Sequence, residues 1–276
     1  MKYDLHCHTK EGSLDARLGI IPYAVMLKSK GYAGMLITDH DSYKGYRYYQ
    51  TMREYDKLPL VLRDFVVLKG IEYDTRDAGH VLVILPDGVD CPLLEKKGLK
   101  LTVLDQIVHE LGGIMGAAHP YGNGYIAITN TRIYKKNPDV IQCFDFIEAY
   151  NSTISGVNNE RAYALAEQYR KPMTAGSDAH STIRVGTAYT RFDEKLTCNN
   201  DLIAYILADR PTEPVGIFYP GLLKKKNEII RQLGIVSYWS YNKAGMIFRT
   251  GARHKHLKRE NYGATIEEPV EVPKND

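Results

Sequence analysis

Two histidines near the N-terminus are separated by one residue, in the run His6-Cys7-His8. Alternate residues of a β-strand point to the same side, so a strand here would direct both imidazoles to one point while Cys7 faces the core. Paired imidazoles are typical of sites for divalent metal ions. The pair alone is ambiguous, because a histidine at a strand end more often has a structural role.

Further nitrogen and oxygen donors lie close to other short apolar runs of the chain. Five of them come at the ends of strand-like runs, namely His40, Glu72, His119, Asp178 and His180, and two more, Asp15 and His80, lie in loops or at a strand start. Such donors suit zinc, manganese or iron, and no cluster of thiolates competes with them. Burying so many polar groups without an ion would be costly, so we expect one metal centre.

The donors belong to short motifs that follow one another in a fixed order. The motifs are Asp4-Leu5-His6-Cys7-His8-Thr9, Ser13-Leu14-Asp15, Thr38-Asp39-His40-Asp41, Gly70-Ile71-Glu72, Ala118-His119-Pro120 and Ser177-Asp178-Ala179-His180. Each is unspecific alone, but the ordered set resembles the polymerase and histidinol phosphatase (PHP) superfamily of phosphoesterases. The resemblance extends over about residues 4 to 190.

The resemblance implies a metal-dependent phosphoesterase that holds two or three divalent ions, with Zn, Mn or Fe as candidates. Carried over by position, the first ion would be bound by His6, His8, Glu72 and Asp178. Glu72 would also bridge to a second ion that is held by His80 and His119. The third ion would be held by Asp15, His40 and His180, and the nearby Glu11 is an alternative carboxylate for it.

The expected reaction is hydrolysis of a small phosphate ester, with a hydroxide that bridges two ions as the nucleophile. Glu72, Asp178 and His180 are the expected catalytic residues, and His180 is one candidate proton donor to the leaving alkoxide. Arg184 lies four residues after His180. Because an arginine fork matches phosphate geometry, we expect Arg184 to bind the substrate, with a surface ion pair as the alternative.

The elements that position these donors are short apolar runs alternating with segments of helical periodicity. The strand-like runs are residues 3–5, 34–38, 65–70, 81–85, 113–118, 144–150 and 173–176, and the helical segments are residues 20–30, 102–111, 158–169 and 201–208. The alternation predicts parallel strands with crossover helices, whose carboxyl ends carry the chemistry. The resemblance implies an α/β fold of the distorted (β/α)7 TIM-like barrel type.

The C-terminal part of the chain has a different pattern. From Pro211 the alternation fades, and Pro214-Val215-Gly216 predicts a turn-rich passage before a last helical stretch at residues 227–233 and a frayed tail at 267–276. We therefore expect a barrel domain over residues 1–210. Residues 211–276 would form a short helical and turn-rich extension with a basic tail, packed on the barrel.

Composition places the chain among ordinary globular proteins. The hydrophobic fraction is 44% and the charged fraction 25%, so a sizeable core is expected. A net charge of +3 does not indicate a nucleic-acid partner, and the basic runs at 224–226 and 253–259 favour a solvated tail over a polyanion-binding strip. Four cysteines without a C-x-x-C pair, no signal-like start and no long apolar run predict a cytoplasmic protein without a membrane partner.

The leading hypothesis is an enzyme that acts on a small phosphorylated substrate such as a nucleotide or an amino-alcohol or sugar phosphate. One alternative is a nuclease or phosphodiesterase acting on nucleic-acid ends, supported only by the basic C-terminal run and the 21 tyrosines. A second is a non-catalytic metal-binding module. The choice of ester, the native metal and the oligomeric state are left open, because pocket loops rather than metal ligands set specificity.

Overall fold

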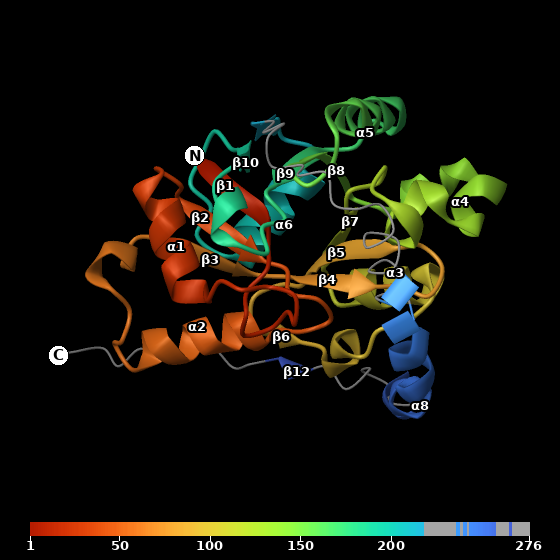
Figure 1. Cartoon of the computed structure of the whole chain (residues 1–276), viewed down its shortest axis with the longest axis horizontal. Coiled ribbons are helices and arrows are strands. Elements are labelled where there is room, and N and C mark those ends of the chain that lie inside the picture. The colour runs from red at the N-terminus through yellow and green to blue at the C-terminus, as the bar shows by residue number, and fades with distance from the viewer. Residues whose placement is uncertain (218–235, 238–239, 242, 258–264, 267–276) are drawn as a thin grey trace.

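Two mixed β-sheets of five strands each form the centre of the molecule (Figure 1). The computed structural model describes residues 1–217, 236–237, 240–241, 243–257 and 265–266. The helical stretch expected at residues 227–233, the basic run at 224–226 and the tail at 267–276 lie outside these residues. No helix in the described ranges is long and apolar enough to cross a membrane.

The first sheet has the strand order β11-β10-β1-β2-β3. Its strands are β1 (Lys2–Cys7), β2 (Gly34–Ile37), β3 (Val66–Lys69), β10 (Ala188–Arg191) and β11 (Glu213–Gly216). β1, β2 and β3 run parallel, whereas β10 and β11 are antiparallel to their neighbours. β11 is thus a strand where Pro214 predicted a turn. It lies at the sheet edge, where a proline without an N–H is tolerated.

The second sheet has the strand order β4-β5-β7-β8-β9. Its strands are β4 (Ile71–Asp74), β5 (His80–Ile84), β7 (Ile114–Ala117), β8 (Phe146–Asn151) and β9 (Met173–Gly176). β7, β8 and β9 are parallel, but β5 is antiparallel to both β4 and β7. The expectation of parallel strands throughout was therefore wrong. Only residues 75–79 separate β4 from β5, too few for a crossover helix, so the two strands form a hairpin.

The two sheets meet at single bridges between residues that follow or lie within their strands. Cys7 of β1 bridges Ala179, just after β9, and His40, just after β2, bridges Glu72 of β4. The result is an α/β fold, as expected, but its sheets are mixed rather than parallel. A separate short pair joins β6 (Val89–Asp90) to β12 (Thr265–Ile266). Both inter-sheet bridges involve residues of the predicted motifs, so the donors of the two sheets meet where the sheets meet.

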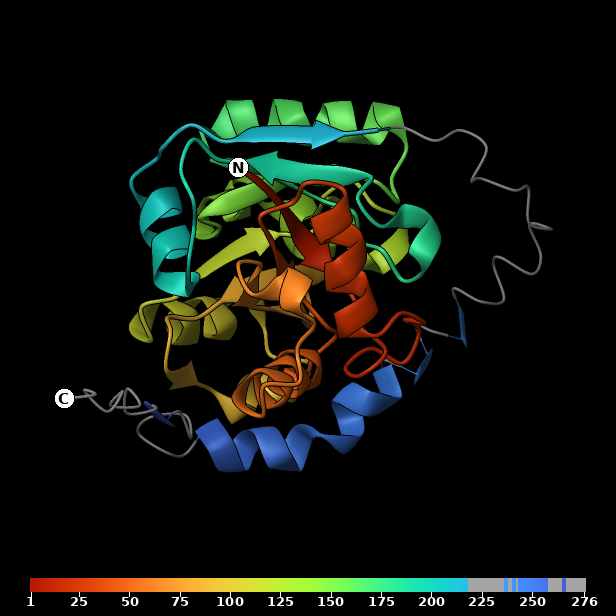
Figure 2. The same cartoon turned by 90° about the vertical axis from the view of Figure 1, so that its left-hand side faces the viewer.

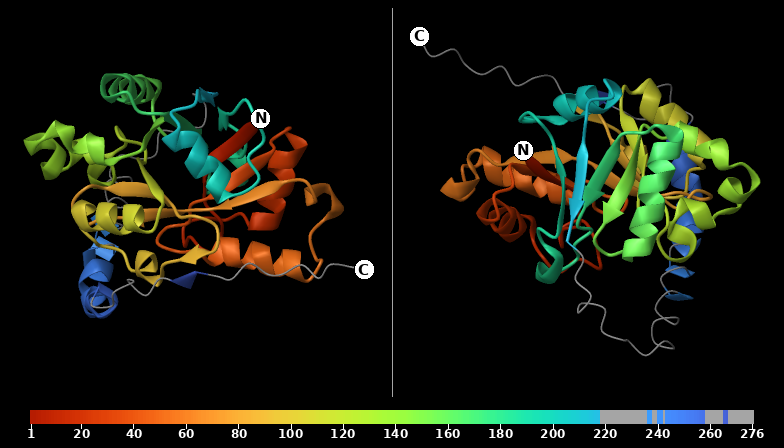
Figure 3. Two further views of the ribbon diagram at one scale, coloured as in Figure 1. Left: turned by 180° about the vertical axis from the view of Figure 1, so that it is seen from behind. Right: turned by 90° about the horizontal axis from the view of Figure 1, so that it is seen from above.

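Helices cover the outer faces of the sheets (Figures 1 and 2). The α-helices are α1 (Ile20–Ser29), α2 (Lys44–Glu54), α3 (Leu101–Glu110), α4 (Arg132–Lys136), α5 (Gly156–Tyr169), α6 (Asn199–Leu207) and α8 (Thr250–Leu257). Short 3-10 helices are η1 (Leu60–Leu62), η2 (Pro92–Glu95), η3 (Gly124–Ile126), η4 (Ile128–Asn130), η5 (Pro138–Cys143) and η6 (Thr182–Arg184). α5 and α8 lie on opposite sides of the molecule, and α3 and α8 lie at the same end (Figure 3).

The four helices expected from periodicity are α1, α3, α5 and α6. In α1 the buried residues Ile20, Tyr23, Ala24 and Leu27 recur at helical spacing and fix the face that packs inward. α2 and α4 were not among the expected segments. α2 buries only Gly45 and Tyr49, so its apolar stripe is weak in the sequence.

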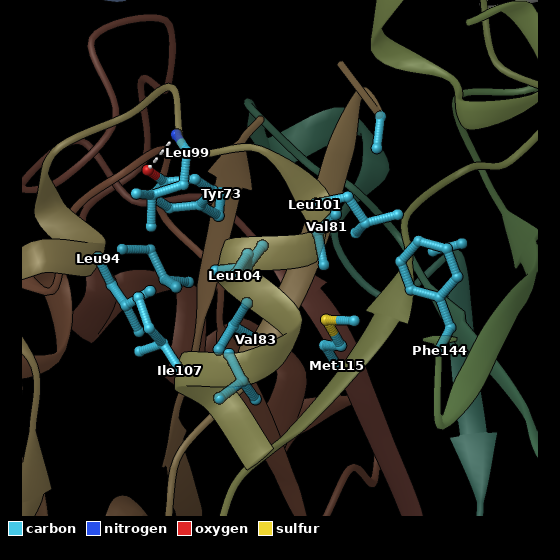
Figure 4. Close-up of a cluster of buried hydrophobic side chains, with 14 of the residues drawn as sticks. Tyr73, Val81, Val83, Leu94, Leu99, Leu101, Leu104, Ile107, Met115 and Phe144 are labelled. Carbon is cyan, nitrogen blue, oxygen red and sulfur yellow. Dashed lines mark hydrogen bonds between the residues drawn. The ribbon is translucent and has the colours of Figure 1, made fainter. Parts of the chain in front are cut away.

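A large apolar cluster packs between the second sheet and α3 (Figure 4). Val81 and Val83 of β5 face Leu104 and Ile107 of α3 in this cluster. Tyr73 of β4 lies at its edge, where its hydroxyl donates to Lys96 O at 2.7 Å and accepts from Leu99 N at 3.0 Å. The core thereby holds the loop at residues 96–99 in place.

Candidate metal centre

Glu72 on β4 lies at the centre of the donor cluster. Its Oε1 is 2.8 Å from His119 Nε2 and 2.9 Å from His80 Nδ1, and its Oε2 is 2.9 Å from His40 Nδ1. The glutamate side chain is 1% exposed. His80 starts β5, the hairpin partner of β4, so the β4–β5 turn brings it next to Glu72. Three imidazoles from three separate segments thus converge on one buried carboxylate.

The His-x-His pair on β1 approaches the same carboxylate from the other sheet. The Nε2 atoms of His6 and His8 are 3.1 Å apart, and they lie 3.4 and 3.3 Å from the Glu72 oxygens. Asp178 Oδ1, after β9, is 3.2 Å from His8 Nε2 and 3.8 Å from His6 Nε2. Cys7 between them packs in the apolar cluster on the opposite side of the strand, as strand alternation predicts.

Asp15, His40 and His180 form the outer rim of the cluster. Asp15 Oδ2 is 3.2 Å from His180 Nε2 and 3.5 Å from His40 Nε2. Glu11, the alternative carboxylate, instead accepts a hydrogen bond from Ile20 N at 3.2 Å, at the start of α1. Gly19, the N-cap of α1, has no side chain to cap that end, so Glu11 supplies the acceptor. The structure thus places Asp15, and not Glu11, beside the two histidines.

The cluster combines buried carboxylates with imidazoles that would neutralise them. Burial alone would raise the pKa of Glu72, but His80, His6 and His40 hold that pKa well below its usual range. Burial would lower the pKa of His6, yet the charges of Glu148, Glu72 and Asp178 raise it well above the usual value. The cluster therefore requires positive charge, which divalent ions would supply in place of protons if they were bound.

Several donor atoms are oriented for an ion rather than for one another. His80 Nε2 and His119 Nδ1 are buried and make no hydrogen bond to a described residue. The facing Nε2 atoms of His6 and His8 can share at most one proton. Four triads of the cluster have ligand atoms within 4.8 Å of one another. The donor chemistry and spacing fit divalent metal ions and suggest metal binding.

Glu148 on β8 orients part of the cluster from behind. Its Oε1 lies 2.9 Å from His6 Nδ1, and its Oε2 accepts hydrogen bonds from His119 N at 2.6 Å and Asn151 Nδ2 at 3.1 Å. A carboxylate on Nδ1 fixes the tautomer that leaves the His6 Nε2 lone pair toward the cluster.

A second support reaches His8 through Ser13. Ser13 Oγ lies 3.2 Å from His8 Nδ1, accepts a hydrogen bond from His40 N at 3.0 Å and donates to Asp39 Oδ1 at 2.9 Å. Asp39 thus reaches His8 through this hydroxyl. Ser13 was quoted in a motif without a role, and its position two residues before Asp15 was the one signal for it.

The backbone is strained at three positions of the cluster. Asp41, His119 and Asp178 have positive φ angles of 47°, 28° and 49°. L-residues rarely adopt this region, and such strain of about 1–3 kcal/mol each gathers at functional sites. The conformations turn the chain sharply just after β2, β7 and β9, which brings the donors of three strands to one place.

Arg184 lies beside the cluster rather than within it. It ends η6, is half-buried, and its Nη1 donates to Ser152 O. Ser152 belongs to the loop after β8, in which the neighbouring Thr153 Oγ1 donates to Asp178 Oδ2 at 3.0 Å. The arginine therefore braces the loop that contacts Asp178.

One family model matches the chain in the region of the last motif. The PHP-associated family model matches residues 156–211, about a fifth of the chain, and this segment contains Asp178 and His180. No curated protein matches the chain. The match to the family model supports the PHP resemblance that the motifs carry.

Several solved structures are similar to this chain at low sequence identity. PsfC from Pseudomonas syringae is 18% identical with a TM-score of 0.56, and the match covers 79% of this chain and 91% of that one. A "putative metal-dependent phosphoesterase" from Bifidobacterium adolescentis is 15% identical with a TM-score of 0.50, over 76% and 96% of the two chains. An amidohydrolase from Chromobacterium violaceum is 14% identical with a TM-score of 0.49, over 67% and 90%.

Proposed function

We propose, from this similarity to the PHP superfamily, that the chain is a metal-dependent hydrolase of small phosphate esters. The observation that carries the proposal is Glu72, a buried carboxylate with three imidazole nitrogens within 2.9 Å. The name of the Bifidobacterium adolescentis structure, which shares the fold, supports the same reaction class. The two sheets, bridged at Cys7 and at His40, correspond in this proposal to a distorted (β/α)7 barrel.

The geometry supports three neighbouring ligand sets, two of which share Glu72, for two or three Zn, Mn or Fe ions. His6, His8, Glu72 and Asp178 form the inner set. Glu72 is shared with a second set that contains His80 and His119. Asp15, His40 and His180 form the third set at the rim, where the side chains of Asp15 and His180 are 45% and 30% exposed. The rim is thus the side from which a substrate approaches.

Divalent ions held there would supply Lewis acidity and a nucleophilic water at neutral pH. The protein residues have separate roles around them. Glu72 and Asp178 provide the negative charge that retains the ions, and Glu148 and Ser13 hold the imidazoles in the required orientation. His180, at the exposed rim, is placed to move a proton to the leaving alkoxide. Arg184 is proposed to orient the phosphoryl group from the loop beside Asp178.

A phosphate-release screen over mono- and diesters tests the proposal when it is run with Mn, Zn, Fe and Mg. Wild-type protein should release phosphate from at least one monoester. Glu72→Ala should lose bound metal by elemental analysis and lose activity by at least about 10³-fold, because one change removes a ligand shared by two sets. Glu54→Ala, at the exposed end of α2, is the matched control and should change neither quantity. Activity that survives in Glu72→Ala would refute the shared-ligand centre.

Two outcomes would favour the alternatives. Full metal occupancy without turnover on any ester would indicate a non-catalytic metal-binding module. Cleavage of nucleic-acid ends that weakens steeply as salt rises would indicate a nuclease, because a polyanion releases counterions on binding. Turnover of a small ester should respond only weakly to salt.

A further inference from the structure

A cavity of about 590 Å³ opens beside the rim of the donor cluster. Asp15 and His40 line it on the cluster side, and Tyr241 and Arg249 line it from the C-terminal part of the chain. Its volume falls within the range of about 300–1,000 Å³ that is typical of small-molecule sites. The cavity is therefore large enough for the part of a substrate that extends beyond the reacting phosphate.

The carboxylates of this cavity already have positively charged or imidazole partners. Asp41 Oδ2 lies 3.0 Å from Lys97 Nζ, and Glu95 Oε1 lies 2.7 Å from Arg47 Nη2. The remaining carboxylate, Asp15, lies against the two rim histidines. None of these three carboxylates is therefore available to neutralise another positively charged side chain that lines the cavity.

The wall nevertheless contains more cations than these. Lys44, Lys96 and Arg249 line the cavity and make no ion pair with a described residue. Arg249 Nη1 donates to Glu95 O at 3.2 Å, which holds the guanidinium at the cavity without neutralising its charge. An excess of positive charge in a concave site favours an anionic ligand.

The C-terminal segment that carries Arg249 is anchored to the core. Arg253 of α8 is 8% exposed and donates to Lys97 O and, at 2.7 Å, to Met246 O. Gly98 has a φ of +96°, and a Cβ there would lie 2.8 Å from Met246, so the segment packs closely on this loop. Tyr73 in turn holds the loop from the core side, as described above. Buried contacts of the neighbouring residues Arg253 and Met246 thus fix the position of Arg249 beside the cavity.

We propose that the C-terminal segment completes the substrate pocket, and that Arg249 and Lys44 select substrates bearing a second anionic group beyond the scissile phosphate. This inference rests on the proposed phosphoesterase function. It assigns residues 240–241 and 243–257 to the site, although sequence alone treated this part of the chain as an extension. Arg249 and Lys44 are specificity-determining residues in this proposal and take no part in bond cleavage.

Two phosphate esters that differ only in a second anion test the selection. Wild-type protein should have a lower KM for 4-carboxyphenyl phosphate than for phenyl phosphate. Arg249→Gln should raise KM about tenfold for the carboxylated ester, change KM for phenyl phosphate less than about twofold, and leave kcat nearly unchanged. Lys255→Gln, an exposed cation on α8 outside the cavity lining, is the matched control and should change nothing. Equal effects of Arg249→Gln on both esters, or none, would overturn the proposal.

A binding measurement separates this inference from the proposed reaction. Inorganic pyrophosphate is titrated calorimetrically into protein kept metal-free by a chelator, so that neither turnover nor metal coordination contributes. Arg249→Gln and Lys44→Gln should each weaken binding about tenfold, and Lys255→Gln should not. If no ester is hydrolysed but this pattern holds, the proposed reaction fails while the anion pocket stands. Absent binding, or equal binding in all variants, would overturn the pocket itself.

Discussion

Substitution of Gly176, at the end of β9, tests whether the donor cluster depends on the close contact between β9 and β1. A Cβ at this position would lie 2.2 Å from His6 Cβ and 2.7 Å from His6 N. Non-bonded carbon atoms need about 3.5–4.0 Å, so Gly176→Ala must move β1 and β9 apart by roughly 1.3–1.8 Å. No rotation of the His6 side chain relieves the contact, because its Cβ and backbone nitrogen are the atoms involved.

The displacement works on stability and on the metal centre separately. Overpacking of this kind costs about 1–3 kcal/mol, a large share of the roughly 5–15 kcal/mol by which a domain is stable. Metal-ligand distances tolerate only about ±0.2 Å, so a shift of His6 by more than about 1 Å should remove it from the inner ligand set. Gly176→Ala should therefore unfold at lower urea concentration and bind divalent metal at least about tenfold more weakly.

Urea denaturation of metal-free protein and metal titration of the folded protein measure the two effects. Gly156→Ala is the matched control, because no atom lies within 4 Å of a Cβ at that position, at the start of α5. It should be neutral or stabilise the protein by about 0.4–1 kcal/mol. A Gly176→Ala protein with wild-type stability and metal affinity would show that the close approach of β9 to His6 is not needed.

Three further substitutions have expected outcomes that follow from single contacts. Glu148→Gln replaces the acceptor at His6 Nδ1 with an amide and should weaken metal binding about 10–100-fold. A competition titration with a chromophoric chelator would measure the affinity, and an unchanged affinity would exclude the orienting role of Glu148. Arg184→Ala should raise KM or lower kcat for a phosphate ester at unchanged metal content, and unchanged kinetics would remove Arg184 from the site. His109→Gln tests pH dependence: burial lowers the pKa of His109, but Asp145 and Asp105 outweigh it and raise that pKa above its usual value. The ion pair should therefore stabilise the fold below about pH 6.5 and lose this effect as pH rises through the raised pKa. The free energy of unfolding of wild type should exceed that of His109→Gln by about 0.5 kcal/mol more at pH 5.5 than at pH 9. Equal differences at the two pH values would contradict the pairing.

Local patterns in the sequence were sufficient for most elements and for the donors themselves. The His-x-His run, the apolar runs and the helical periodicities depend on residues within a few positions of one another, and α1, α3, α5 and α6 appear close to where they were expected. Strand alternation also placed His6 and His8 on one side and Cys7 on the other. Their roles as ligands remain proposals.

The direction of the strands was a less local property. β5 runs antiparallel between β4 and β7, although the apolar runs read as a regular parallel alternation. The tight turn at residues 75–79 decides the first of these pairings, and His80 reaches Glu72 because of it. The expected extension likewise contains β11, and no local sequence pattern predicted that β11 pairs with β10.

The sequence by itself determined which donor atoms the chain offers and the order in which its strands present them. Only the tertiary structure decided which residues lie next to them. Glu148 contacts His6 across 142 positions of the chain, and Ser13 connects Asp39 to His8. Glu11 bonds to the start of α1 instead, and Arg249 lines the cavity beside His40. The physical reason is that such contacts arise from the packing of whole sheets and helices. That packing depends on many weak apolar contacts between segments that are distant in the chain, so it cannot be predicted from a short stretch of sequence.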